Sequence, residues 1–255
     1  MKTILTILTC LLVTISLKAQ NKVITSGKID FEKRINMHAA AKNEIGDGVM
    51  VEFYKQQYDN YKKSAPQFVT LKSTLVFNND KSLFTPIKPE TPINNFMGNP
   101  IATQINTIYT DMSAKNMIAE KIIYGDQFLL KDSIRKITWR LTDETQEVAG
   151  YACRRANGIM LDSVYVVAYY TDKIWMSSGP ESFAGLPGMI LKVALPHLNI
   201  IWTATKVSVE NVSPATIIPP KKGDVVNNKQ LFDKLKIATK NWGAWGPYEM
   251  KIFLL

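Results

Sequence analysis

The stretch GPESFAGLPGMILKV, residues 179–193, contains two prolines and three glycines and ends in an apolar run. Proline fixes its own φ angle and glycine tolerates positive φ, so residues of this kind build turns. Residues 186–189 predict a type II turn, because Pro187 suits its first central position and Gly188 its second. The turn leads straight into residues 190–195, which are apolar and predict a strand.

We interpret this stretch as structural. Gly185, Pro187 and Gly188 are expected to fix the direction in which the apolar strand enters a sheet. Phe183 and Leu186 are expected to cover the edge or the open end of that sheet. The stretch is therefore expected to set the register of a strongly apolar strand and to cover the edge or open end of the sheet.

An alternation of apolar and polar residues, which is typical of half-buried strands, recurs along the chain. It is found in residues 29–37, 68–77 and 137–141, and more weakly in residues 102–109 and 116–124. Residues 163–171 are apolar on both faces and predict a central strand. Short polar turns separate many of these runs, and strands joined in this way pair antiparallel. Residues 189–195 and 199–209 are expected to form one such hairpin. The pattern predicts a mainly β fold, a curved antiparallel sheet or half-barrel with two or three helices.

Two segments have helical spacing. Residues 49–63 carry an aromatic stripe that is interpreted as core, made of Met50, Tyr54, Tyr58 and Tyr61. Near the end of the chain, four apolar residues fall on one helical face: Leu231, Leu235, Ala238 and Trp242. Asn227 or Asn228 is expected to cap this amphipathic C-terminal helix, and Gly243 to end it. The helix is expected to lie across the sheet.

The first residues have the layout of a secretory signal. Lys2 precedes an uncharged apolar run over residues 4–17, and polar sequence follows from Lys18. The run is shorter than the ~20 residues that a membrane-spanning helix needs, which favours a cleaved signal peptide. We expect residues 1–20 to be this signal and residues 21–255 to form a single β-rich domain. The mature chain is expected to have no transmembrane segment.

The formal net charge is +9, but the lysines are spread along the chain and form no basic motif. A solvated surface explains this charge better than nucleic-acid binding. Neither a phosphate-binding loop nor a dinucleotide fingerprint is present, so no cofactor is expected. No metal site is expected either, because structural zinc takes four ligands. Beyond the signal, the cysteines and histidines are Cys153, His38 and His197, which lie far apart in sequence.

Two groups raise the question of catalysis. Cys153 would need a histidine close in space, and its place in an alternating run is typical of a buried, small hydrophobic residue. Asp143, Glu144 and Glu147 form an acidic group at a turn, where such residues are usually solvated. We therefore expect no catalytic residues, and an enzyme centred on Cys153 or on the acidic group ranks last among the functions considered.

Residues 185–190, GLPGMI, resemble the signature of the GLPGLI family, also called the Porph_ging family, with Met189 in place of a leucine. Residues 139–156, WRLTDETQEVAGYACRRA, resemble the same family's pattern of Trp, Leu-Thr, Glu and Gly-Tyr-x-Cys-x-x-Ala. The segment AYYT and the positions of Ser82 and Phe84 agree with it. The resemblance extends over about residues 29–209.

This resemblance implies an envelope protein of Gram-negative bacteria, located in the periplasm or cell envelope, without an established biochemical activity. Members of the family look like partners or accessories of outer-membrane transport systems. The resemblance assigns no catalytic residue.

The sequence leaves two main functional hypotheses. In the first, the chain is a non-enzymatic binding or accessory protein that holds an apolar ligand, peptide or partner segment in a concave face, with Trp175, Phe183 and Leu186 at the rim. In the second, it is an interaction subunit of an outer-membrane transport complex of the TonB-dependent type. The proline-rich residues 86–100 are either a lid over a ligand or a passive connection. The aromatic residues suit a hollow sheet and a filled core equally.

Overall fold

The computed structural model describes residues 23–45, 50–243 and 245–255. The predicted signal peptide lies outside these residues. The strands are β1 (Ser26–Asn36), β2 (Phe68–Asn78), β3 (Lys81–Pro86), β4 (Asn106–Asp111), β5 (Asn116–Ile123), β6 (Asp126–Ser133), β7 (Thr138–Val148), β8 (Tyr151–Met160), β9 (Val164–Thr171), β10 (Met189–Leu195), β11 (Ile200–Val209) and β12 (Asp224–Val226). The helices are α2 (Met37–Lys42), α3 (Val51–Ser64), α4 (Asn228–Ala238) and α5 (Trp245–Leu254), and short 3-10 turns are η2 (Phe96–Gly98), η3 (Pro196–Leu198) and η4 (Pro214–Thr216).

All twelve strands belong to one sheet, in the order β12-β6-β5-β4-β3-β2-β1-β11-β10-β9-β8-β7. The sheet is open, with β12 and β7 at its two edges. Neighbouring strands pair antiparallel, and the one exception among the described strands is the three-residue strand β12, which lies parallel to β6. This confirms the predicted mainly antiparallel fold, including the hairpin of β10 and β11.

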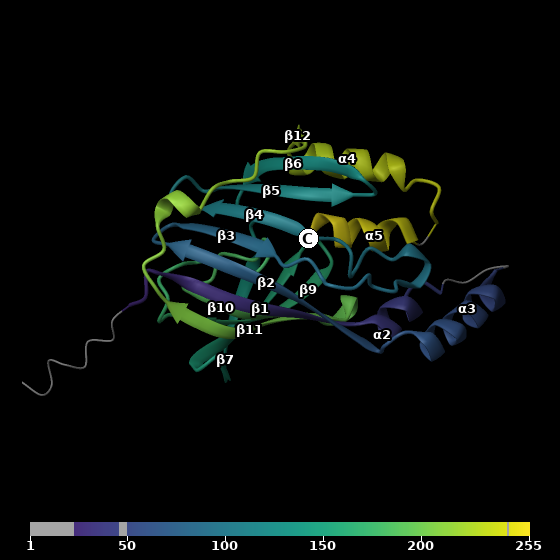
Figure 1. The fold of residues 1–255 in the computed structure, drawn as a ribbon, viewed down its shortest axis with the longest axis horizontal. Helices are drawn as coiled ribbons and strands as arrows, with labels where there is room; N and C mark the ends of the chain where they lie inside the picture. The colour runs from purple at the N-terminus through teal and green to yellow at the C-terminus, as the bar shows by residue number, and fades with distance from the viewer. Residues whose placement is uncertain (1–22, 46–49, 244) are drawn as a thin grey trace, which may run out of the picture.

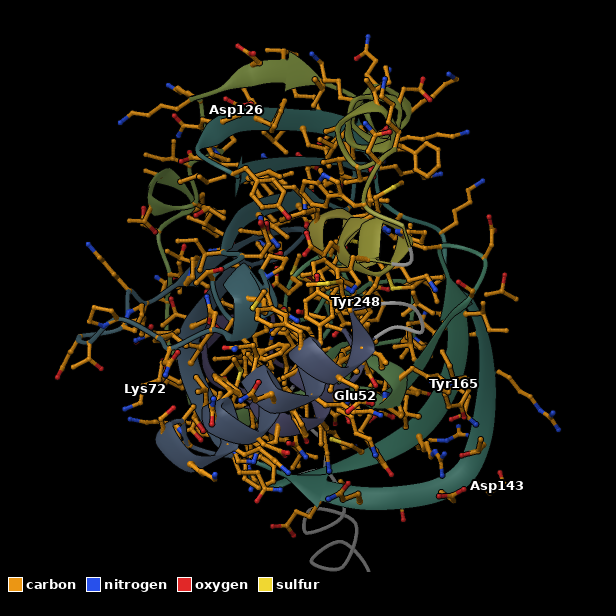
Figure 2. All side chains as sticks on the ribbon, turned by 90° about the vertical axis from the view of Figure 1, so that its right-hand side faces the viewer. Glu52, Lys72, Asp126, Asp143, Tyr165 and Tyr248 are labelled. Carbon is orange, nitrogen blue, oxygen red and sulfur yellow. The ribbon has the colours of Figure 1, made fainter. Side chains whose placement is uncertain are left out.

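The sheet is strongly bent (Figure 1). In the view of Figure 2, Lys72 of β2 lies on one side of the molecule, and Asp143 of β7 and Tyr165 of β9 lie on the other. Tyr248 of α5 stands between them in this view. Twist accumulates from strand to strand, so a sheet of this many strands curls unless it is flattened by stacking. The curl gives the sheet a concave side in which apolar residues collect.

Alternation along β1 shows how the sequence builds this core. Ile29, Phe31 and Ile35 are buried, whereas Asp30 and Glu32 between them are partly exposed. Burial of each such side chain stabilises the folded state by ~1.5–3 kcal/mol. Phe31 and Ile29 pack in one apolar cluster and Ile35 in a second, so β1 joins the two clusters.

Helix α5 fills the concave side of the sheet. Its end contributes Ile252 to one apolar cluster and Phe253 to the other, and Leu255 behind it is buried too. The hydroxyl of Ser182 donates a hydrogen bond to the main-chain oxygen of Leu255 at 2.8 Å. The stretch that precedes β10 is therefore fastened to the C-terminal helix.

The C-terminal helical prediction is partly wrong. α4 begins as expected, since Asn227 and Gln230 form a capping box. The helix ends at Ala238 and not at Gly243, so Trp242 lies beyond it. α5 was not predicted, because Gly246 and Pro247 near its start resemble a break, although proline is tolerated in the first turn of a helix. The described residues therefore contain four α-helices in place of two or three.

The predicted helix over residues 49–63 is confirmed as α3, but its aromatic stripe is only partly core. Tyr61 is buried and donates a hydrogen bond to the Asn94 carbonyl at 3.0 Å. Met50, just before the helix, is 53% exposed. The helix packs at one end of the sheet and exposes its other face (Figure 1).

The turn before β10 needs glycine for two reasons. Gly188 has a φ angle of 141°, and a Cβ atom there would lie 2.1 Å from the Thr171 carbonyl oxygen. The Gly188 N–H bonds to the Leu186 carbonyl at 2.8 Å, which closes a three-residue turn in place of the predicted type II turn. In the described part of the chain, no helix combines the length and the apolar character needed to cross a membrane.

Candidate ligand-binding pocket

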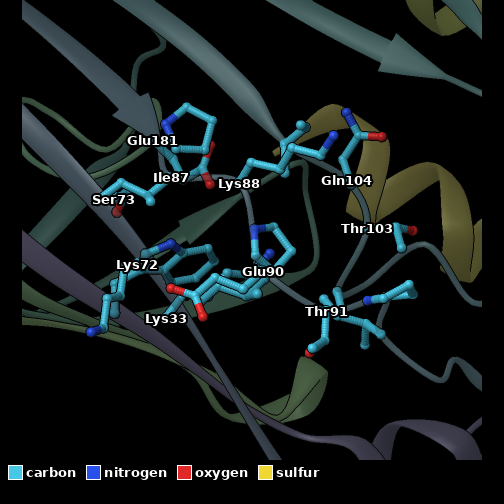
Figure 3. Close-up of a pocket in the computed structure, with 18 of the residues that line it drawn as sticks. Lys33, Lys72, Ser73, Ile87, Lys88, Glu90, Thr91, Thr103, Gln104 and Glu181 are labelled. Carbon is cyan, nitrogen blue, oxygen red and sulfur yellow. The ribbon is translucent and has the colours of Figure 1, made fainter.

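A pocket of about 530 Å³ lies between strands β1 to β3 and the proline-rich segment that follows β3. Figure 3 shows Lys72 and Ser73 on one side of it, Thr103 and Gln104 on the other, and Glu90 between them in this view. This volume falls within the range of small-molecule sites. Eight consecutive residues of the proline-rich segment, 86–93, line the pocket.

The walls of the pocket are largely apolar. They are formed by Leu71, Phe84, Pro86, Ile87, Pro89, Pro92, Ile93, Ala102, Ile105 and Trp202. The indole of Trp202 is 1% exposed and packs against the ring of Phe183, with 5.7 Å between the ring centroids. Ligand sites usually combine walls of this kind with a few fixed polar groups.

Strand register places a lysine in the pocket. Lys33 of β1 is paired with Leu71 of β2 on one side and with Trp202 of β11 on the other. It lies in the same alternation as the buried residues of β1, and it is itself only 7% exposed. Its ammonium group donates a hydrogen bond to the Ile101 carbonyl oxygen at 2.9 Å and lies 5.2 Å from the centroid of the Trp202 ring.

A carboxylate completes the polar part of the pocket. Glu181 is 7% exposed and accepts a hydrogen bond from the Asn106 amide at 2.9 Å. Asn106 in turn accepts one from the Gln104 amide at 2.9 Å. The φ angle of Glu181 is 50°, a strained value for a residue other than glycine. Such strain persists where the surroundings impose it, and it is frequent at functional sites.

Burial and the charge of a nearby carboxylate shift the pKa values of two buried lysines in opposite directions. Burial lowers the pKa of Lys33, and the negative charge of Glu181 opposes that effect. Lys121 of β5 is fully buried, donates to the Phe253 carbonyl at 3.1 Å, and has its pKa lowered to about 7 by burial. Glu181 again opposes the shift. One carboxylate therefore acts on two buried lysines.

Ser73 adds an unsatisfied hydrogen-bonding group. It lines the pocket from β2 and is 5% exposed. Within the part of the chain that the structure describes, its hydroxyl has no hydrogen-bond partner. Buried hydroxyls are nearly always hydrogen-bonded, so each exception calls for an explanation. A partner supplied from within the pocket is one such explanation.

Residues 158–192 match the family model described as "Protein of unknown function (Porph_ging)". This match confirms the predicted resemblance to the Porph_ging family over these residues. It covers the strained Glu181 as well as the glycine-proline turn, so the Porph_ging segment contributes a charged group to the pocket in addition to shaping the entry of β10. No curated protein matches the chain.

Two solved structures share the fold. The structure of PNGF-II in a P21 crystal form has 13% sequence identity and a TM-score of 0.50, and covers 82% of this chain and 33% of that one. A second, in a C2 crystal form, has 12% identity and the same TM-score, and covers 82% and 32%. The chain thus spans about a third of the length of the PNGF-II chain. At this identity the likeness concerns the fold alone.

The three residues predicted for the rim do not come together. Phe183 and Leu186 of the Porph_ging segment are each 1% exposed and belong to the apolar core, as the expected covering role implies. Trp175 is 73% exposed. It borders a different hollow of about 750 Å³, which Pro187 and Gly188 also line.

The residues considered for catalysis lie outside the pocket. Cys153 is buried in the apolar core, and burial raises the pKa of its thiol to about 11, the opposite of what a nucleophile needs. Glu144 is paired with Arg155 at 2.6 Å on the exposed strand β7. Within the described ranges, no cluster of three or more potential metal ligands occurs.

Lys33, Ser73 and Glu181 were not among the predicted site residues. For the first two the sequence carries a signal, because each takes an inward position in an otherwise apolar alternation: Lys33 between Phe31 and Ile35, and Ser73 between Leu71 and Leu75. A polar residue in such a position needs a partner inside the protein. For Glu181 the signal is weaker, since it lies in a turn where charged residues are common.

Proposed function

We propose that this chain is a non-enzymatic binding protein of the periplasm or cell envelope, which holds an apolar ligand between the proline-rich segment and strands β1 to β3. The observation that carries the proposal is the pocket of about 530 Å³, which combines apolar walls with a few buried polar groups. An apolar ligand would gain free energy by leaving water for these walls, at ~25 cal/mol per Å² of apolar surface buried.

The position of the proline-rich segment supports entry of a ligand from solvent. Four residues of the segment line the pocket and are exposed to solvent: Ile87, Lys88, Pro89 and Glu90. They form a thin layer between the interior of the pocket and water. Proline restricts the backbone of this segment, and a preformed wall reduces the entropy lost on binding. The segment therefore has the character of a cover over a ligand.

The placement of the groups considered for catalysis supports a non-enzymatic role. The Cys153 thiol is packed in the core, and the acidic group lies on an edge strand. The location rests on the signal-like residues 1–20, which precede the described residues.

A fluorescence titration with Nile red, an uncharged apolar dye, tests the proposal. Ile87→Asp introduces a charge at the pocket, and Ile122→Asp on β5 is the matched control, since the two isoleucines are 48% and 45% exposed. We expect saturable binding to the wild-type chain, an affinity roughly tenfold or more lower for Ile87→Asp, and an unchanged affinity for Ile122→Asp. Absent or unsaturable binding, or an equal loss in both variants, would refute the proposal.

A second candidate function is an interaction subunit of an outer-membrane transport complex of the TonB-dependent type. The exposed indole of Trp175, beside the hollow lined by Pro187 and Gly188, favours it. Tryptophan is enriched at the energetic centres of protein interfaces. Affinity capture from envelope extracts with the wild-type chain and with Trp175→Ala separates the two functions: a specific outer-membrane partner lost only in Trp175→Ala supports the subunit.

A further inference from the structure

The charges around the pocket are unbalanced. Three lysines line it, Lys33, Lys72 and Lys88, against two glutamates, Glu90 and Glu181. Lys33 is buried and forms no salt bridge with a carboxylate of the described residues. Buried charges are usually paired, so this region has an excess of positive charge that an incoming anion would balance.

The imbalance lies where the pocket meets solvent. Lys72 and Lys88 line the pocket together with one acid, Glu90, and all three are exposed (Figure 3). Exposed charges contribute little to affinity, but they favour the approach of an oppositely charged ligand. Two lysines for one glutamate at this opening favour an anionic ligand.

Lys33 has the hydrogen-bonding capacity to hold an anionic group. An ammonium has three N–H donors, and one of them is used by the Ile101 carbonyl. The carboxylate of Glu181 is engaged by the Asn106 amide. Ser73 lies two residue pairs from Lys33 along β1 and β2, since Ser73 is paired with Phe31 and Lys33 with Leu71. Its hydroxyl has no partner among the described residues. Lys33 and Ser73 thus offer donors to one polar group at the sheet.

The apolar walls extend from this polar corner along the proline-rich segment. Leu71, Ile87, Ile93 and Ile105 line the pocket and carry no polar side-chain atoms. A ligand that fills the pocket therefore meets a charged end and a hydrocarbon wall. An unbranched chain with one head group has this distribution of polarity.

Resting on the proposed function, we infer that the ligand is a single-chain amphiphile with an anionic head group, a carboxylate or a phosphate, which Lys33 and Ser73 hold while the chain lies under the proline-rich segment. Charge-assisted hydrogen bonds of this type are about twice as strong as neutral ones. The head group also balances the excess of lysine over glutamate among the residues that line the pocket.

Displacement of Nile red by a matched set of ligands tests this inference with the wild-type chain. Dodecanoate and dodecyl phosphate carry anionic heads, dodecanol is neutral, and dodecylamine is cationic. We expect one or both anions to bind roughly tenfold or more tightly than dodecanol, and dodecylamine to bind most weakly. The stronger of the two anions identifies the head group.

Lys33→Met keeps the length of the side chain and removes its charge, and Lys131→Met on the exposed face of β6 is its control. The preference for the anion over dodecanol is expected to disappear in Lys33→Met and to persist in Lys131→Met. Ser73→Ala is a smaller change. It is expected to lower the affinity for the anion several-fold and to leave the affinity for Nile red unchanged. The inference would be overturned if the wild-type chain bound the anions and dodecanol with equal affinity, or if it preferred dodecylamine. Saturable binding of Nile red in the same experiment would still support the proposed function.

Discussion

Lys33 and Trp202 face each other across strands β1 and β11, with the ammonium nitrogen 5.2 Å from the centroid of the indole ring. An aromatic face attracts a cation, and the attraction increases when both groups are removed from water. The pair joins the charged part of the pocket to its apolar wall. It also explains how a lysine is tolerated on the inward side of a strand whose other inward residues are apolar.

Lys121 should make the stability of the protein depend on pH in a defined direction. Its pKa is about 7 in the folded chain and returns to the usual value, near 10.5, on unfolding. Between these values the unfolded chain binds more protons, so the free energy of unfolding rises with pH. Lys121→Met lacks this contribution. In urea titrations from about pH 7 to about pH 9, the wild type should gain about 1 kcal/mol per pH unit relative to the variant. Parallel profiles would contradict the lowered pKa of the buried Lys121.

Phe183 and Trp175 were predicted to share one role, and their burial predicts opposite responses to truncation. Phe183→Ala removes a ring from the core and should lower the free energy of unfolding by ~3–5 kcal/mol. Trp175→Ala removes an exposed ring and should change it by less than ~0.5 kcal/mol. Chemical denaturation of both variants checks this, and similar losses would place the two rings in similar environments.

Gly188 should be far less replaceable than another glycine with positive φ. Gly188→Ala brings a Cβ atom within 2.1 Å of the Thr171 carbonyl oxygen, whereas the Cβ of Gly150→Ala, at a φ of 83°, meets open space. We expect a loss of more than about 3 kcal/mol for Gly188→Ala and of about 1 kcal/mol for Gly150→Ala. Thermal melts of the two variants measure the difference, and equal shifts would show that backbone strain alone accounts for the turn.

The Cys153 thiol should be unreactive in the folded protein. Its side chain is buried, and its pKa is raised to about 11. In a chain that lacks residues 1–20, it is the single thiol. At about pH 8, an aromatic disulfide reagent should react at least about a hundredfold more slowly with the native chain than with the urea-unfolded chain. Rapid native labelling would instead reopen the case for a thiol-based activity.

Much of the fold follows from local periodicity. Alternation predicted the positions of β1 and β2, because each half-buried strand must divide its apolar and polar residues between two faces. The run of residues 163–171, apolar on both faces, predicted β9, and the hairpin pattern predicted β10 and β11. α5 was missed because its Gly246 and Pro247 resemble a loop. The position of this helix on the concave side of the sheet depends on its contacts with both apolar clusters. Such contacts between distant segments leave no local pattern.

The candidate site was predictable only in part. The proline-rich segment was singled out as a lid or a passive connection, and residues 86–93 do line the pocket. The choice of Trp175, Phe183 and Leu186 as rim residues relied on their apolar character, which does not distinguish a core ring from an exposed one. Lys33 and Ser73 interrupt apolar alternations, and this interruption is the sequence signal that leads to the pocket.

The most direct test of the account is to locate a bound ligand on the chain. A fatty acid that carries a photoreactive diazirine on its chain is added to the wild-type protein, and the mixture is photolysed. The labelled residues are then mapped by peptide mass spectrometry. The account predicts saturable labelling of residues 86–93 and of Leu71 or Ile105, which unlabelled dodecanoate prevents. Labelling confined to the hollow beside Trp175, or labelling that dodecanoate does not reduce, would contradict it.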